Sequence, residues 1–189
     1  NLEYALHEAS DLAQALTLVW YKERWPRFQQ EYRALAVEEE VRSTLYENDH
    51  YVVILMTRHD AILERIADGA LLQWELKTAQ TTNKNWIDSW EHNLQLAAQQ
   101  LALRTWAGQN GLSDRPIAGA MIEALIKGRR ERDKDGQWRQ QTPLIYAYYK
   151  AGDGLFIADQ VSTSWKRDWH KRLVSTFQSL EQWINEGLS

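Results

Sequence analysis

The sequence predicts a mixed α/β domain in which a central sheet is flanked by helices. Three observations lead to this prediction. Apolar residues recur at helical spacing over residues 3 to about 31, strand-like apolar runs follow up to residue 79, and helical spacing returns after residue 83. The chain has 189 residues. Because this length suits one hydrophobic core, we interpret 1–189 as a single domain.

The first half is expected to form a long amphipathic helix followed by an antiparallel meander. Pro26 is the expected interruption of the helix, because proline removes a backbone donor. Asn48 and Asp49 mark the first turn of the meander, and Asp68-Gly69 is a dipeptide that favours a tight hairpin. The expected strands are 33–45, 50–66 and 70–79.

The second half is expected to return to the same sheet. One helix is predicted from Asn83 to Gly108, and a central strand over Pro116–Lys127 after a crossover connection. Three further segments complete the prediction: a charged loop over Gly128–Gln141, a strand over Thr142–Lys150 and a helix over Ser164–Asn185.

Composition excludes several classes of function. The chain has no cysteine, which rules out disulfides, thiolate nucleophiles and cysteine-ligated zinc or iron–sulfur centres. No run approaches the roughly 20 apolar residues that cross a bilayer, and no signal-peptide layout opens the chain. The sequence therefore predicts a cytoplasmic protein without a membrane partner. Asn1 stands where a start methionine would, which leaves open whether residues precede it.

The net charge of −4 implies that any binding of nucleic acid is local. Basic residues cluster in three places, and each cluster is interpreted either as phosphate contacts or as a solvated surface. The clusters are Lys22, Arg24 and Arg27; Lys127, Arg129, Arg130, Arg132 and Lys134; and Lys166, Arg167, Lys171 and Arg172. The ten tryptophans are expected to build the core or the rims of a groove.

Two carboxylates and a lysine are the strongest candidates for chemistry. Glu75 and Lys77 lie two apart on a predicted strand, so their side chains leave the same face. If Asp68-Gly69 sets the hairpin register, Asp60 lies nearly opposite Lys77 and one pleat from Glu75. The two carboxylates and the carbonyl of Leu76 would then suit Mg²⁺, or Mn²⁺ in its place, while the lysine stays outside the metal shell. The alternative is an exposed cross-strand ion pair between Asp60 and Lys77.

Four blocks in order resemble the PD-(D/E)XK nuclease superfamily, in its RecB-like exonuclease branch with phage relatives. The blocks are A-V-E-E-E-V, M-T-R-H-D-A-I, W-E-L-K-T-A and N-L-Q-L-A-A-Q, and the resemblance runs from about Val37 through Lys127. It implies a restriction-endonuclease-like core, Asp60 and Glu75 as metal ligands, Lys77 as the catalytic lysine, and Gln95 assisting from the following helix.

The same resemblance also implies a metal-ligand histidine from the first helix, where His7 is available. The sequence departs from the family pattern at two positions. Thr57 replaces a usual glycine, and Gln99 replaces a frequent tyrosine, which puts the contact from that helix in doubt.

The sequence therefore predicts a divalent-metal-dependent deoxyribonuclease that hydrolyses phosphodiester bonds of DNA. The resemblance favours an exonuclease and allows a motor or recombination partner. Two rival interpretations stay open. One is an inactive nucleic-acid-binding or scaffolding relative on the same fold, and the other is a helical adaptor in which the charged hairpin is structural.

Overall fold

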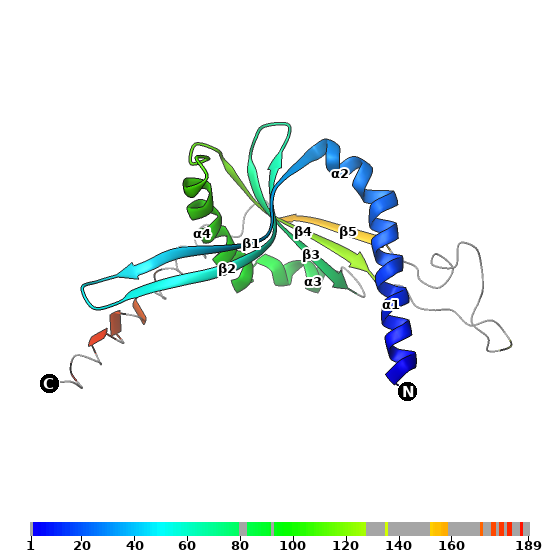
Figure 1. Ribbon diagram of the computed structural model, residues 1–189, viewed down its shortest axis with the longest axis horizontal. Helices are drawn as coiled ribbons and strands as arrows, with labels where there is room; N and C mark the ends of the chain where they lie inside the picture. Colours follow the sequence, from blue (N-terminus) through cyan, green and yellow to red (C-terminus); the bar gives the residue numbers. More distant parts are fainter. Residues whose placement is uncertain are drawn as a thin grey trace.

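The computed structural model has a mixed five-stranded sheet with strand order β1-β2-β3-β4-β5 and helices packed on it (Figure 1). It describes residues 2–79, 83–91, 93–127, 135, 152–158, 171, 175, 176, 178, 179, 181, 182 and 186. Strands β1 (Tyr32–Glu47), β2 (Val52–Arg65) and β3 (Leu71–Ala79) form the predicted antiparallel meander. Strand β4 (Ile117–Ile126) is parallel to β3, as a crossover requires, and β5 (Gly152–Ala158) is antiparallel to β4.

The N-terminal segment is helical over the predicted range but contains one irregular stretch. Helix α1 (Leu2–Val19) continues into a π-helical stretch, η1 (Trp20–Arg24), and then into α2 (Trp25–Glu31). Pro26 occupies the first turn of α2, a position that suits the fixed φ of proline. The irregular stretch therefore precedes the proline, and the proline begins the next helix.

Strands β1 and β2 form a long hairpin that projects beyond the rest of the sheet (Figure 1). Its turn is stabilised by Asn48, whose Oδ1 accepts the backbone N–H of His50 and of Tyr51, both at 2.9 Å. This is the turn chemistry that the sequence predicts, because an asparagine side chain substitutes for a backbone acceptor.

The β2–β3 turn is longer than predicted, and the predicted register is wrong. Arg65 N–H donates to the carbonyl of Ala70 at 2.8 Å, so four residues rather than two make the loop. Asp68 Oδ1 accepts the N–H of Ala70 at 3.1 Å, and Gly69 has a φ of 70°. The ladder consequently pairs Ala61 with Trp74. Extending that register puts Asp60 beside Glu75 and not opposite Lys77.

The helix predicted from Asn83 to Gly108 is two helices, α3 (Lys84–Glu91) and α4 (Leu94–Gln109). Asn93 separates them, because its side chain accepts the N–H of Leu96 at 3.1 Å and caps α4. The apolar spacing continues through the break, so the pattern alone does not show it.

Part of the C-terminal prediction lies outside the described residues. The predicted strand 142–150 is not described, and neither is the predicted loop 128–141 apart from Asp135. The described strand in this region is β5, which the sequence does not predict. The described positions between residues 171 and 186 are helical, in agreement with the predicted final helix.

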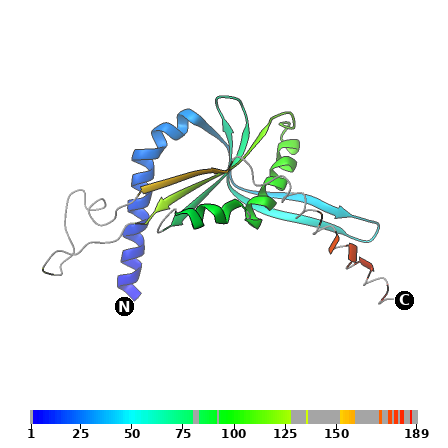
Figure 2. The ribbon, with the colours of Figure 1, turned by 180° about the vertical axis from the view of Figure 1, so that it is seen from behind.

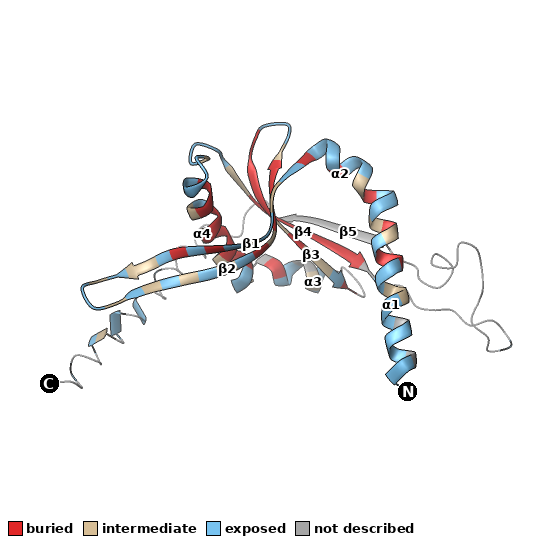
Figure 3. Ribbon diagram, in the orientation of Figure 1, coloured by how far each residue is buried: buried red, intermediate tan, exposed pale blue. Residues whose placement is uncertain are grey.

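The core lies on both faces of the sheet, and the buried positions concentrate on β3, β4 and α4 (Figure 3). Along β2, Ala61 and Leu63 pack with Phe28 of α2, whereas Ile62 packs with Leu103 and Trp106 of α4. The two faces of the sheet are therefore covered by different helices, which Figure 2 shows from behind. Among the described helices, none is both long enough and apolar enough to span a membrane.

Candidate metal and catalytic site

Asp60 lies at the point where β2 and β3 stop pairing. The described ladder ends at Ala61–Trp74, which leaves the backbone of Leu76 without a β2 partner. The carboxylate of Asp60 takes this place, because its Oδ2 accepts the N–H of Leu76 at 2.9 Å. An unpaired N–H in a central strand would cost about 1–3 kcal/mol. This hydrogen bond therefore fixes Asp60 against the backbone between Glu75 and Lys77.

Glu75 and Lys77 leave the same face of β3, as the sequence predicts. Glu75 is fully buried, and Lys77 Nζ lies 2.5 Å from its Oε2. Burial raises the pKa of Glu75 and the neighbouring charge of Asp60 raises it further, while the contacts with Lys77 and Gln99 oppose the rise. The site therefore holds a carboxylate whose ionised form depends on a cationic partner.

Helix α4 contributes two glutamines to the same carboxylate. Nε2 of Gln95 donates to Glu75 Oε1 at 2.8 Å, and Nε2 of Gln99 donates to that oxygen at 2.5 Å. The two glutamines are four apart, which places both on one side of the helix. The resemblance predicts the assisting role of Gln95, and the sequence shows Gln99 only as a departure from the family pattern. The contact between Gln99 and Glu75 is not predicted from the sequence.

The donor set is compatible with a hard divalent cation of the Mg²⁺ type. Because Oε1 of Glu75 accepts two amide N–H groups, Oε2 is the oxygen left for a cation, and Lys77 is its neighbour. In the described part of the chain, no three histidine, aspartate or glutamate side chains group as metal ligands. Asp60 and Glu75 would thus be the two carboxylate ligands of an ion that keeps several waters, as Mg²⁺ does. The predicted ligation by the Leu76 carbonyl stays a prediction.

His7 and Glu38 do not join this group. His7 is exposed on α1, and it is not part of a metal-ligand cluster within the described residues. Glu38 is exposed and forms an ion pair with Arg58, with 2.8 Å between Oε2 and Nε. Its φ of 52° marks an irregularity of β1 between the pairs Val37–Ala61 and Glu39–His59.

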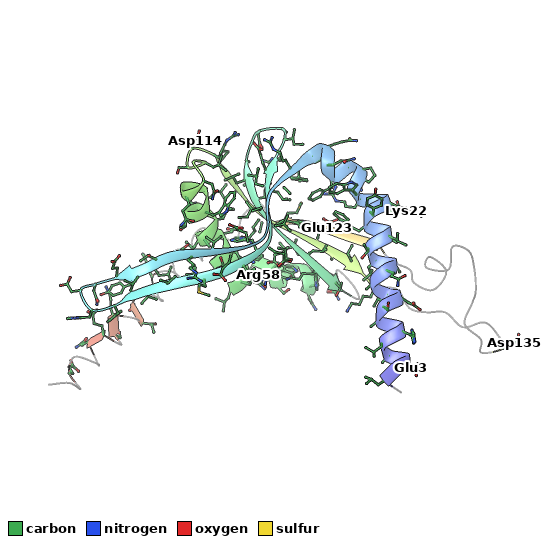
Figure 4. All side chains as sticks on the ribbon, in the orientation of Figure 1. Glu3, Lys22, Arg58, Asp114, Glu123 and Asp135 are labelled. Atoms are coloured by element: carbon green, nitrogen blue, oxygen red, sulfur yellow. The ribbon has the colours of Figure 1, made fainter. Side chains whose placement is uncertain are left out.

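A second buried carboxylate, Glu123, lies behind β3 on the opposite face. Its oxygens accept the indole N–H of Trp20 at 2.8 Å and that of Trp74 at 3.0 Å, and Arg24 Nε lies 3.3 Å away. Figure 4 shows Glu123 near the centre of the sheet and Lys22 toward its periphery. The sequence predicts that Arg24 either contacts phosphate or lies on a solvated surface, but its side chain is 2 % exposed, so both predictions are wrong for this residue. A lone glutamate within the apolar run of β4 was the available signal.

Trp86 and Trp90 of α3 pack against a core cluster that includes residues of α4 and β4. Their rings meet edge to face with centroids 5.4 Å apart, and Trp90 is buried against Leu96 and Ile122. Of the two roles expected for the tryptophans, the core or the rim of a groove, Trp90 therefore has the first.

No protein-family model matches this chain, and no curated protein sequence matches it.

Proposed function

We propose that this chain is a divalent-metal-dependent deoxyribonuclease in which Asp60 and Glu75 hold the cation and Lys77 is the catalytic lysine. The observation that carries the proposal is the convergence of these three side chains where β2 and β3 separate. The four sequence blocks that resemble RecB-like exonucleases support the same assignment. We place the protein in the cytoplasm and take DNA as its substrate.

The geometry favours this proposal over an exposed ion pair between Asp60 and Lys77. Asp60 bonds the backbone N–H of Leu76, and Lys77 contacts Glu75 instead. Burying a carboxylate on a central strand is costly unless it is paired and hydrogen-bonded. A surface ion pair would contribute about 0–1 kcal/mol and would need no such burial. The contacts of Asp60 and Lys77 are therefore not those of the exposed cross-strand ion pair that the alternative requires.

Each residue has a distinct role in the proposed reaction. A bound Mg²⁺ would polarise the scissile phosphate and stabilise the leaving oxygen. Asp60 and Glu75 supply the anionic oxygens that hold it, and Gln95 keeps Oε1 of Glu75 in place. With a cation held at Oε2 of Glu75, the ammonium group of Lys77 would be placed to orient the attacking water and to offset charge on the phosphate.

Cleavage of end-labelled linear and circular DNA, with Mg²⁺ or with a chelator, tests the proposal. We expect Mg²⁺-dependent cleavage that Glu75→Gln and Lys77→Met abolish, because both substitutions keep the shape of the side chain and remove its charge. Lys84→Met is the matched control, since Lys84 is an exposed lysine paired with Asp88 on α3. Full-rate cleavage by either site variant would contradict the proposal, and the two DNA forms separate an exonuclease from an endonuclease.

A binding module without turnover is the second candidate, and the close contact between Lys77 and Glu75 favours it. An ammonium group at Oε2 already compensates the carboxylate, so a cation is not needed for charge balance. Calorimetric titration with Mg²⁺ distinguishes the two candidates. If the protein is a nuclease, the wild type should bind Mg²⁺ and Asp60→Asn should not. If it is a pure binding module, the titration should show no Mg²⁺ site that this substitution removes.

A further inference from the structure

Gln99 is a buried residue of α4 whose amide is fully engaged. Its side chain lies among polar atoms of two strands, and the residue is 2 % exposed. Nε2 donates to Glu75 Oε1 at 2.5 Å and to the backbone carbonyl of Arg58 at 2.8 Å. Its Oε1 accepts an N–H of Gln73 at 3.1 Å. Both hydrogens and the oxygen of the amide are therefore used, which fixes the orientation of the side chain.

These contacts connect the two strands that carry the candidate ligands. Arg58 lies two residues before Asp60 on β2, and Glu75 lies on β3. The described β2–β3 ladder ends at Ala61–Trp74, just before both positions. Gln99 thus spans the two strands where backbone pairing has stopped. Gln95 cannot substitute for it, because its side chain is exposed and its hydrogen bond reaches only Glu75.

We propose that Gln99 is a positioning residue that sets the spacing between Asp60 and Glu75 for cation binding. The inference rests on the proposed function, since it assigns a role within the same site. By holding Oε1 of Glu75, Gln99 directs Oε2 toward the cation. By holding the carbonyl of Arg58, it keeps the β2 segment that carries Asp60 at a constant distance from β3. Groups that orient metal ligands typically change metal affinity about 10–100-fold when removed.

Gln100 provides a matched control on the same helix. It is the adjacent residue, has the same side chain and is 3 % exposed. Neither polar atom of its amide has a hydrogen-bond partner among the described residues. Replacing Gln100 by leucine therefore changes volume, polarity and helix propensity as the same change at Gln99 does, but it breaks no contact with the site.

Titration of the full chain with Mn²⁺ alone tests the inference, with calorimetry for affinity and electron paramagnetic resonance for the environment of the bound ion. We expect Gln99→Leu to bind Mn²⁺ at least about tenfold more weakly and with an altered spectrum. We expect Gln100→Leu to match the wild type. Gln73→Leu removes only the hydrogen bond to Oε1 of Gln99, so it should weaken Mn²⁺ binding less than Gln99→Leu does.

The outcomes separate the inference from the proposed function. If the wild type binds no Mn²⁺, both are overturned. If the wild type binds Mn²⁺ but Gln99→Leu does so equally well, or Gln100→Leu is weakened as much, only the positioning role is overturned. Should Gln99→Leu fail to fold, Gln73→Leu decides, and unchanged Mn²⁺ affinity in that variant refutes the role of the network.

Discussion

The buried imidazole of His59 makes the stability of the protein sensitive to acid. His59 is fully buried on β2, with its Nε2 3.5 Å from Thr57 Oγ1. Burial lowers the pKa of His59 from 6.5 to about 4, and the neighbouring charge of Asp60 only partly offsets this. The unfolded chain therefore takes up a proton at a higher pH than the folded chain. The stability that the neutral ring provides is present above pH 6.5 and is lost as the pH falls toward 4.

The size of the effect follows from the two pKa values. The pKa of His59 is 6.5 in the unfolded chain and about 4 in the folded chain. Relative to neutral pH, the free energy of unfolding is therefore lower by about 2 kcal/mol at pH 5 and by about 3 kcal/mol at pH 4. This is a large part of the 5–15 kcal/mol that is typical of a folded domain.

Guanidinium unfolding of the metal-free protein at pH 7 and pH 5 measures this loss. We expect the wild type to lose about 2 kcal/mol more between the two pH values than His59→Leu does. His50→Gln is the control, because His50 is exposed in the hairpin turn and should leave the wild-type pH dependence unchanged. Equal pH dependence in His59→Leu and the wild type would refute the assignment of the effect to this ring.

Two further predictions concern the backbone at irregular positions. Glu38→Gly should raise the free energy of unfolding by about 1 kcal/mol, because it relieves a left-handed φ of 52° and removes only an exposed ion pair with Arg58. Urea titration measures this change, and a free energy of unfolding below that of the wild type would contradict the prediction. Gly69→Ala should lower the free energy of unfolding by about 1–2 kcal/mol, since φ is 70° and an added Cβ would lie 2.0 Å from Arg115 Nη1. Gly111→Ala is its control, with a φ of 71° but open space around the added Cβ, and equal losses would show that the contact with Arg115 costs nothing.

The meander and the shared face of Glu75 and Lys77 were predictable because they depend on local rules. Turn residues at Asn48 and Asp68-Gly69 divide the apolar runs, and alternation along a strand fixes which side chains share a face. Neither inference needs knowledge of a distant segment.

The register and the helix break were not predictable, because single side chains decide them. Asp68 caps the N–H of Ala70 and makes a four-residue loop, which moves Asp60 beside Glu75. Asn93 caps α4 within an apolar pattern that otherwise continues. Both residues satisfy backbone groups locally, and a periodicity analysis does not weigh such bonds against the simpler alternative.

The role of Gln99 escaped prediction for a different reason. Its partners Arg58, Gln73 and Glu75 come from two strands, at separations of 41, 26 and 24 residues. An isolated glutamine on a helix gives no indication of such contacts. The polar residues Gln73 and Glu75 within the apolar run of β3 were the clearer signal, because a buried polar group implies a partner elsewhere in the chain.

The same argument applies to Glu123 and changes the expected nucleic-acid interface. A carboxylate in the middle of β4 requires compensation, and Arg24 and the indoles of Trp20 and Trp74 provide it. The two faces of the central strands therefore each hold a buried carboxylate with its own cationic partner, Lys77 on one face and Arg24 on the other. Arg24 is consequently committed to the core and cannot contact a phosphate. Any electrostatic attraction of DNA must come from the remaining basic residues, so a salt-dependence analysis of DNA binding should count Lys22 and Arg27 of that cluster but not Arg24.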